Sequence, residues 1–502
     1  MGLALGALAF AAILLTPPPG GLAVEAWRTA AVAVLMGVWW MTEAIPIPAT
    51  ALLPLVLFPL LGVLPMTEAA EPYANDLIFL FMGGFFLAVA MEGWNLHKRI
   101  ALGIVAAVGT SPEGLVLGFM IATAFLSMWI SNTATAAMML PIGLAVAAIF
   151  RPEAGDAARS PSGGPSDGDA GREVDEETSL YPFGTALMLG IAYGASIGGV
   201  ATLIGTPPNA VLAGAASEML QVEIGFLQWM LVGLPLTVVM LPVAWLLLVR
   251  VLYPPGEVSG DAEAVLEAER ASLGPVGRGE ATVAIVFTVT ALAWVMRAPK
   301  TFGGFTIPGI QTFAPEVRDS TIAMAAAVAL FLIPVDWKRG RFALGWERAR
   351  TIPWGVLILF GGGLSLARAM DVSGLAAWIG GAVTGLGGVP VWVLVLVTAA
   401  LFVFLTEMTS NTATSTMAMP VMVGAAAGLG MAPVSLMAAA ALSASMAFML
   451  PVATPPNAIV FASPHVTIPR MMRAGFFLNL AAIAIITVAV TVLVPRLLPS
   501  GL

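Results

Sequence analysis

Two short polar motifs occur twice in an otherwise apolar chain. The first is Ser-Asn-Thr-Ala-Thr, beginning at Ser131 and again at Ser410, and the second is Thr-Pro-Pro-Asn, beginning at Thr206 and again at Thr454. Hydroxyl and amide groups can donate hydrogen bonds to an anion, and their oxygens can coordinate a hard cation such as sodium. Consecutive prolines interrupt a helix and free backbone carbonyls and amides. The motifs therefore favour a site for a small anion and cations.

Neither Ser-Asn-Thr block contains a lysine or an arginine. An anion bound there must be held by helix N-termini, neutral donors and co-bound cations, which is a physical reason to expect ion coupling. Polar residues in membrane helices often serve only to hold helices together. Because two such motifs are duplicated in matching positions, we favour a functional site.

The duplication extends beyond the motifs themselves. Residues 123–142 align without gaps to residues 402–421 at an offset of 279, with nine of twenty positions identical. The Thr-Pro-Pro-Asn pair has an offset of 248, and the difference of 31 residues matches an acidic insertion after Phe150. An odd number of predicted crossings separates the copies, so we expect two repeats of opposite orientation in the membrane, as in many secondary transporters. Substrate and ions then belong at the interface between the repeats.

Composition places these motifs in a membrane. Of 502 residues, 59% are hydrophobic and only 10% are charged, and 53 Gly with 37 Pro predict helices that are broken in places. The chain has no Cys and two His, which excludes disulfides, thiolate metal sites and Cys nucleophiles. We find no nucleophile with a base inside the predicted spans, so we predict no enzyme, no cofactor other than coupling sodium ions, and no nucleic-acid partner.

We predict an all-α polytopic membrane protein with about eleven transmembrane helices and two re-entrant hairpins, embedded in the lipid bilayer. The crossings are expected near residues 3–15, 25–43, 46–65, 77–96, 183–203, 224–250, 281–297, 319–335, 353–369, 434–452 and 474–495. The hairpins are expected at 112–150 and 389–427, because each stretch is too long for one span and too short for two with a loop.

These elements divide the chain into five parts. They are N-terminal helices at 1–76, a first repeat core at 77–253 with an acidic loop at 151–181 and a broken helix at 183–220, a second acidic loop at 254–280, scaffold helices at 281–352, and a second repeat core at 353–502 with a broken helix at 434–462. The acidic segments carry most of the net charge of −8, and we interpret them as solvated, flexible loops.

Basic residues in short connections set the expected orientation. They all lie on one side if the N-terminus is cytoplasmic and the C-terminus is outside: Lys98, Arg99, Lys338, Arg339, Arg341, Arg348, Arg350, Arg470 and Arg473. The first apolar stretch has no basic segment before it and no obvious cleavage site, so we expect a retained helix. The prediction is an integral protein of the cell membrane.

The paired Ser-Asn-Thr motifs, each followed by a helix broken at Thr-Pro-Pro-Asn, resemble the divalent anion/sodium symporter family of di- and tricarboxylate carriers. The segments 40–46 (WMTEAIP) and 198–206 (GGVATLIGT) resemble it too. The resemblance implies a homodimer in which a scaffold domain holds the interface. A transport domain with both hairpins and both broken helices would move as an elevator. It also implies sodium-coupled import of C4-dicarboxylates such as succinate, malate or fumarate.

The resemblance also implies site residues. One sodium site would use Ser127, Ser131, Asn132 and Gly205, and the other would use Thr406, Thr409, Asn411 and Ala453, several through backbone carbonyls. Substrate carboxylates would meet Ser131, Asn132, Thr133, Ser410, Asn411 and Thr412, with Thr206, Thr454 and Pro455 completing the pocket. The repeat offset pairs Ser127 with Thr406 independently of the resemblance.

Alternatives remain at this stage. A sodium-independent dicarboxylate exchanger, a citrate or sulfate carrier on the same fold, and an inorganic-ion antiporter of a distantly related fold would share many of these features. Glu407 breaks the internal symmetry, because the first half has Met128 at the matching position. Its carboxylate could influence a cation site or carry a proton, or it could be satisfied by neighbouring hydroxyls and backbone amides.

Overall fold

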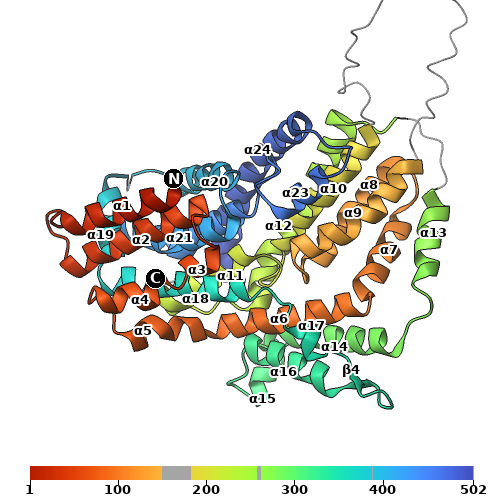
Figure 1. Ribbon diagram of the computed structural model, residues 1–502, viewed down its shortest axis with the longest axis horizontal. Helices are drawn as coiled ribbons and strands as arrows, with labels where there is room; N and C mark the ends of the chain where they lie inside the picture. Colours follow the sequence, from red (N-terminus) through yellow and green to blue (C-terminus); the bar gives the residue numbers. More distant parts are fainter. Residues whose placement is uncertain (150–181, 257–261, 303, 387, 501–502) are drawn as a thin grey trace, which may run out of the picture.

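The computed structural model describes residues 1–149, 182–256, 262–302, 304–386 and 388–500, so the predicted loop at 151–181 lies outside it. Within these residues the chain is mostly helical, and its strands form two small antiparallel pairs (Figure 1). They are β1 (Lys300–Phe302) with β2 (Phe305–Ile307), and β3 (Pro334–Asp336) with β4 (Arg341–Phe342). The predicted all-α membrane fold is confirmed.

The N-terminal part contains two longer helices followed by short ones. They are α1 (Gly2–Leu15), α2 (Val24–Thr42), α3 (Ile47–Thr50), α4 (Leu53–Leu60), α5 (Met66–Ala70) and the 3-10 turn η1 (Glu71–Ala74). The structure differs from the single crossing predicted at 46–65, since α3 and α4 are separate. Pro48 and Pro54 each occupy the first turn of one of these helices, where a missing N–H costs nothing.

Four helices in the first half have counterparts in the second. The first set is α6 (Asp76–Gly93), α7 (Leu96–Val108), α8 (Pro112–Ser127) and α9 (Asn132–Ile149). The second set is α18 (Trp354–Val372), α19 (Leu375–Val383), which continues into the 3-10 turn η3 (Thr384–Leu386), α20 (Val391–Thr406) and α21 (Asn411–Leu429). The starts of α19, α20 and α21 follow those of α7, α8 and α9 by 279 residues, the offset seen in the sequence.

Each hairpin is followed by a helix in two pieces. The first pair is α10 (Pro182–Gly199) and α11 (Pro207–Leu220), and the second is α22 (Pro433–Ala444) and α23 (Pro455–Phe461). Both α11 and α23 begin at the first proline of Thr-Pro-Pro-Asn, because proline suits the first helical position. Helix α11 packs against α21, and α23 packs against α9, so elements of the two halves are interleaved.

The remaining helices connect and surround these pairs. They are α12 (Phe226–Leu246) continuing into the π-helical turn η2 (Leu247–Leu252), α13 (Ala262–Ser272), α14 (Arg278–Val295), α15 (Ile310–Phe313), α16 (Asp319–Leu332), α17 (Trp346–Ala349), α24 (Ile468–Val492) and α25 (Val494–Leu497). Seven helices of the described chain are long and apolar enough to cross a membrane, and shorter apolar helices, including α8 and α20, accompany them. Figure 1 shows α8, α9 and α10 side by side at one end and α1, α2 and α19 at the other.

The second acidic segment, at 254–280, differs from the predicted loop, because part of it forms α13. Ala262 and Leu266 lie four residues apart and are buried on one face of this helix. The helix packs against α7 and α9, and Lys98 of α7 pairs with Glu269 at 2.8 Å. The acidic composition predicted a loop, although the segment contains a short amphipathic helix. The helices that pack against it, α7 and α9, lie more than 100 residues earlier in the sequence.

Candidate functional site

The first hairpin turns through polar residues. Helix α8 ends at Ser127 and α9 begins at Asn132, and the Ser127 hydroxyl donates to Asn132 Oδ1 at 2.5 Å. Ser127 is fully buried, whereas Ser131 is exposed and its hydroxyl accepts from the backbone N–H of Ala134 at 3.2 Å. Ser131 therefore caps α9 in the manner of a polar N-terminal residue.

The break between α10 and α11 lies directly against this hairpin tip. The Thr202 hydroxyl lies 2.5 Å from the carbonyl oxygen of Met128 and accepts from the N–H of Gly205 at 3.1 Å. A Cβ atom at Gly205 would lie 3.0 Å from the carbonyl oxygen of Ser127, and a Cβ atom at Gly199 would lie 2.6 Å from Asn132 Oδ1. The structure thus brings together Ser127, Asn132 and Gly205 of the first predicted sodium site.

The second hairpin repeats this geometry. The Thr406 hydroxyl, at the end of α20, lies 2.7 Å from Asn411 Oδ1 and 2.9 Å from the carbonyl oxygen of Ala444, where α22 ends. Thr409 lies beside Thr414, with their hydroxyl oxygens 2.6 Å apart. Ser410 caps α21 by accepting from a backbone N–H at 3.5 Å. Predicted residues Thr406 and Asn411 therefore meet each other and the second break.

Two asparagines hold the breaks in the broken helices. They are the last residues of the two Thr-Pro-Pro-Asn motifs, and the sequence analysis gave them no role. Asn209 donates from Nδ2 to the carbonyl oxygen of Thr202 at 2.7 Å, and Asn457 donates to that of Leu450 at 3.0 Å, seven residues earlier in both cases. Both side chains are fully buried, and within the described residues their Oδ1 atoms have no hydrogen-bond partner. The sequence signal that could have identified them is that both occur at the end of the duplicated Thr-Pro-Pro-Asn motif.

Glu407 is held by the second broken helix. Its carboxylate accepts from the backbone N–H groups of Phe448, Met449 and Leu450 at 2.7 to 3.1 Å, and from Asn479 Nδ2 at 2.7 Å. The residue is 3% exposed. Of the roles considered from the sequence, this arrangement favours the carboxylate satisfied by backbone amides. Three consecutive N–H groups freed by the break would otherwise lack acceptors.

Asn479 is a residue that the sequence analysis missed. It lies fully buried within α24, a long apolar helix. A buried amide in such a helix is costly unless it has a partner, and that polarity was the only available signal. Its partner could not be read from the sequence, since Glu407 is 72 residues away.

The other predicted residues are placed less directly. Thr454 caps α23, because its hydroxyl accepts from the N–H of Asn457 at 3.3 Å. Thr206 and Ala453 are buried, Pro455 and Thr133 are exposed, and Thr412 is half-buried. In the part of the chain that the structure describes, no hydrogen bond joins the side chains of Thr133, Thr206 or Thr412 to another predicted site residue.

The chemistry of the region is that of neutral donors and acceptors. No group of three or more His, Cys, Asp or Glu residues that could hold a metal occurs among the described residues. Four helices, α9, α11, α21 and α23, begin at the polar motifs, and a helix N-terminus carries a partial positive charge. Carbonyl, hydroxyl and amide oxygens suit sodium, while the helix starts suit carboxylates.

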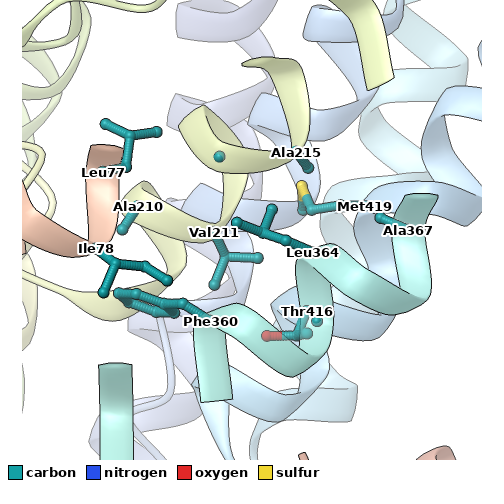
Figure 2. Close-up of a pocket in the computed structure, with 12 residues that line it drawn as sticks. Leu77, Ile78, Ala210, Val211, Ala215, Phe360, Leu364, Ala367, Thr416 and Met419 are labelled. Atoms are coloured by element: carbon teal, nitrogen blue, oxygen red, sulfur yellow. The ribbon is translucent and has the colours of Figure 1, made fainter. Parts of the chain in front are cut away.

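An apolar pocket whose lining includes none of the predicted site residues lies between α6, α11, α18 and α21 (Figure 2). It is lined by Leu77, Ile78, Ala210, Val211, Gly214, Ala215, Phe360, Gly363, Leu364, Ala367, Thr416 and Met419. Its volume of about 10 Å³ is room for about one water molecule. In this conformation the pocket is too small for a dicarboxylate. It marks a narrow apolar seam that has α6 and α18 on one side and α11 and α21 on the other.

The sequence matches known transporters along its whole length. Residues 1–497 match the family model described as the sodium:sulfate symporter transmembrane region. The chain is 42% identical over 500 residues to a Staphylococcus saprophyticus protein named sodium-dependent dicarboxylate transporter SdcS, covering 99% of this chain and 92% of that protein. A protein of the same name from Staphylococcus aureus strain USA300 is 41% identical over 505 residues, with the same coverage.

Two solved structures share the fold. The YdaH transporter of Alcanivorax borkumensis superposes with a TM-score of 0.59 at 17% identity, covering 93% of this chain and 100% of that one. MtrF of Neisseria gonorrhoeae, described as illuminating a class of antimetabolite efflux pumps, has a TM-score of 0.58 at 14% identity, covering 96% and 98%. At these identities the similarity concerns the fold alone.

Proposed function

Because the chain belongs to the divalent anion/sodium symporter family, we propose that it imports C4-dicarboxylates such as succinate, malate or fumarate by sodium-coupled symport. The chain is an integral membrane transporter and not an enzyme. The observation that carries the proposal is a pair of polar hairpin tips, each with a buried hydroxyl (Ser127 or Thr406), each hydrogen-bonded to a broken helix, and each in a block without any basic residue. The names of the staphylococcal relatives support sodium and a dicarboxylate as the transported species.

The proposed sites follow the two halves. One sodium ion is bound by Ser127, Ser131, Asn132 and Gly205, and the other by Thr406, Thr409, Asn411 and Ala453. The substrate carboxylates are bound by Ser131, Asn132, Thr133, Ser410, Asn411 and Thr412, with Thr206, Thr454 and Pro455 around them. Two similar anion-binding ends suit a substrate with a carboxylate at each end.

Sodium coupling follows from the electrostatics. A dianion entering a site without lysine or arginine leaves water without gaining a full positive charge, which is unfavourable in a medium of low dielectric constant. Two sodium ions bound next to the carboxylates would neutralise the substrate. The cation sites must therefore be filled before the substrate binds tightly, and this requirement links the two fluxes.

We also propose that transport uses an elevator movement. We assign α6 and α18, which begin the two repeat cores predicted from the sequence, to the scaffold, and α11 and α21 move past them with the hairpins. The seam between them is apolar and contains glycines at 214 and 363, which lets the helices approach closely. A homodimer, opposite membrane orientation of the two repeats, and a cytoplasmic N-terminus with the C-terminus outside complete the proposal.

We expect labelled succinate to enter proteoliposomes only when sodium is present outside. With an inward sodium gradient, uptake into empty vesicles should exceed uptake in sodium-free choline buffer by at least about tenfold, because the dianion needs its co-bound cations. The measurement compares both buffers, each with and without internal succinate. Unlabelled malate, fumarate, citrate and sulfate are added as competitors.

The same assay separates the alternatives. Uptake that ignores sodium but requires internal succinate would make the protein an exchanger and remove the cation sites while leaving the anion site. Competition by citrate or sulfate in preference to malate would change the substrate class. Indifference to every organic acid, with competition by an inorganic ion, would leave an ion antiporter.

We expect a cross-link across the seam to stop transport. A Cβ atom at Gly214 on α11 would lie 3.0 Å from Leu364 Cδ2 on α18, so a Gly214→Cys/Leu364→Cys pair can be bridged by mercuric ion. If α11 slides along α18, the bridged protein should lose more than about 90% of its uptake, and excess thiol should restore it.

The chain has no cysteine of its own, so background reaction is absent. The controls are the Leu364→Cys variant treated in the same way and the double variant before mercuric ion is added. Both should keep their uptake, because residue 364 then lacks the Cδ2 atom that a Cβ atom at 214 would crowd. Full transport by protein that has been bridged at this pair would exclude sliding of α11 along α18, without affecting the assignment of the substrate.

A further inference from the structure

A second pocket, of about 560 Å³, lies at the start of α14 and shares no residue with the polar motifs. Three segments that are far apart in the sequence form it: the end of α6, the first turn of α14, and the β3–β4 hairpin. Its charged and aromatic lining residues are Trp94, Arg278, Asp336, Trp337, Lys338 and Arg341. Unlike the apolar seam, this pocket is large enough for a charged group of several atoms.

The pocket carries positive charge that the described residues do not neutralise. Its carboxylate, Asp336, lies 3.7 Å from Arg339 Nε, measured from Oδ2. Within the described residues, no ion pair involves Arg278, Lys338 or Arg341. Three cations therefore face a space whose one lining carboxylate already has a partner, and the group that fits such a space is an anion.

The wall of the pocket is fixed by Trp94. Its indole N–H donates to the carbonyl oxygen of Ala343 at 2.8 Å, and the guanidinium carbon of Arg341 lies 5.4 Å from the centre of its ring. A Cβ atom at Gly279 would overlap the ring, so the indole packs directly on the backbone of α14. The second tryptophan of the pocket, Trp337, is 79% exposed.

The pocket lies at the end of an apolar helix that has one exposed face. Helix α14 is apolar and long enough to span, and its first residue, Arg278, lines the pocket. Ile285, Val289 and Leu292 are spaced as one helix face and are 64%, 60% and 58% exposed. Tryptophan and basic side chains at the end of an apolar helix are typical of the level of lipid headgroups. A ligand with a phosphate in the pocket can thus lay acyl chains along α14.

We propose that this pocket binds the headgroup of an anionic phospholipid, with the phosphodiester among Arg278, Lys338 and Arg341 and the acyl chains against the outer face of α14. A neutral polyol headgroup such as glycerol leaves the phosphate charge available to the three cations. A choline headgroup adds a positive charge that they repel, so phosphatidylglycerol should bind in preference to phosphatidylcholine. This inference does not depend on the transported substrate.

Native mass spectrometry of the purified full-length protein in a neutral detergent tests the site. Phosphatidylglycerol and phosphatidylcholine with identical acyl chains are titrated separately. In an Arg278→Gln/Lys338→Gln variant we expect phosphatidylglycerol binding to weaken about 30-fold, with little change for phosphatidylcholine. The matched control is Arg348→Gln/Arg350→Gln, which removes the same charge from neighbouring residues that do not line the pocket.

A variant that is expected to bind phosphatidylglycerol more tightly tests whether lost binding reflects misfolding. Asp336→Asn removes the negative charge from the pocket and should tighten phosphatidylglycerol binding about fivefold. Equal binding of both lipids, or unchanged phosphatidylglycerol binding in the double variant, would overturn the proposal. Displacement of the lipid by glycerol phosphate alone would make this a soluble phosphate site. A changed oligomeric state in the same spectra, with lipid binding intact, would make it a contact between copies of the chain.

Discussion

Glu407→Ala is expected to destabilise the folded protein by about 3–5 kcal/mol and to reduce transport at least about a hundredfold. The substitution removes the acceptor for three backbone N–H groups, those of Phe448, Met449 and Leu450, which the break in the second broken helix leaves without helical partners. It also leaves Asn479 Nδ2 without its acceptor. Thermal unfolding of the purified protein in detergent, together with uptake in vesicles, measures the two effects.

Graded variants distinguish an anchoring role from a role in ion binding. Glu407→Gln keeps one acceptor oxygen but turns an NH₂ group toward backbone donors, so we expect a smaller loss of about 2 kcal/mol. The control is Met408→Ala at the neighbouring position, whose side chain is 79% exposed and should matter little. If Glu407→Ala unfolds like the unsubstituted protein and shifts only the sodium dependence of uptake, the carboxylate belongs to a cation site instead.

The repeated elements could be predicted from the sequence because local signals fix them. Prolines begin α8, α11, α22 and α23, and a polar residue precedes or begins each helix after a hairpin tip. These signals are duplicated, and the starts of α20 and α21 follow those of α8 and α9 by the same 279 residues that separate the repeated sequences. The repeat offset paired Ser127 with Thr406, and the family resemblance grouped Ser127 with Asn132 and Thr406 with Asn411. Both of these groups contain a hydrogen bond between the two residues.

The rest depends on contacts between distant residues, which one sequence does not reveal. Glu407 reaches backbone amides 41 to 43 residues later, and no side-chain pattern marks those amides. Helix α13 forms where composition predicted a loop; Ala262 and Leu266 are buried on one of its faces, and Lys98 of α7 pairs with its Glu269. The basic pocket at α14 was not predicted from the sequence either. Lys338 and Arg341 were used only to predict the orientation in the membrane, and the other lining residues were given no role.

Gly205→Ala is expected to abolish transport while the protein still folds and inserts. A Cβ atom at this position would overlap the carbonyl oxygen of Gly199 and lie 3.0 Å from that of Ser127. Both are backbone atoms, so the hairpin tip and the break must move apart to make room. Binding sites tolerate displacements of only about 0.5 Å in their ligands, so we expect sodium-dependent uptake to fall at least about a hundredfold.

Gly103→Ala is the matched control for this prediction. Gly103 lies in α7, and a Cβ atom there would have no atom within 4 Å. Alanine is favoured over glycine inside a helix by up to about 1 kcal/mol, so this variant should transport normally and be slightly more stable. The two variants add the same methyl group, and only the one at 205 places it between the proposed ligands of the first sodium ion. If both variants transported at the normal rate with unchanged sodium dependence, the first cation site could not lie between Ser127 and the break. Only the second hairpin tip could then form a cation site with its broken helix.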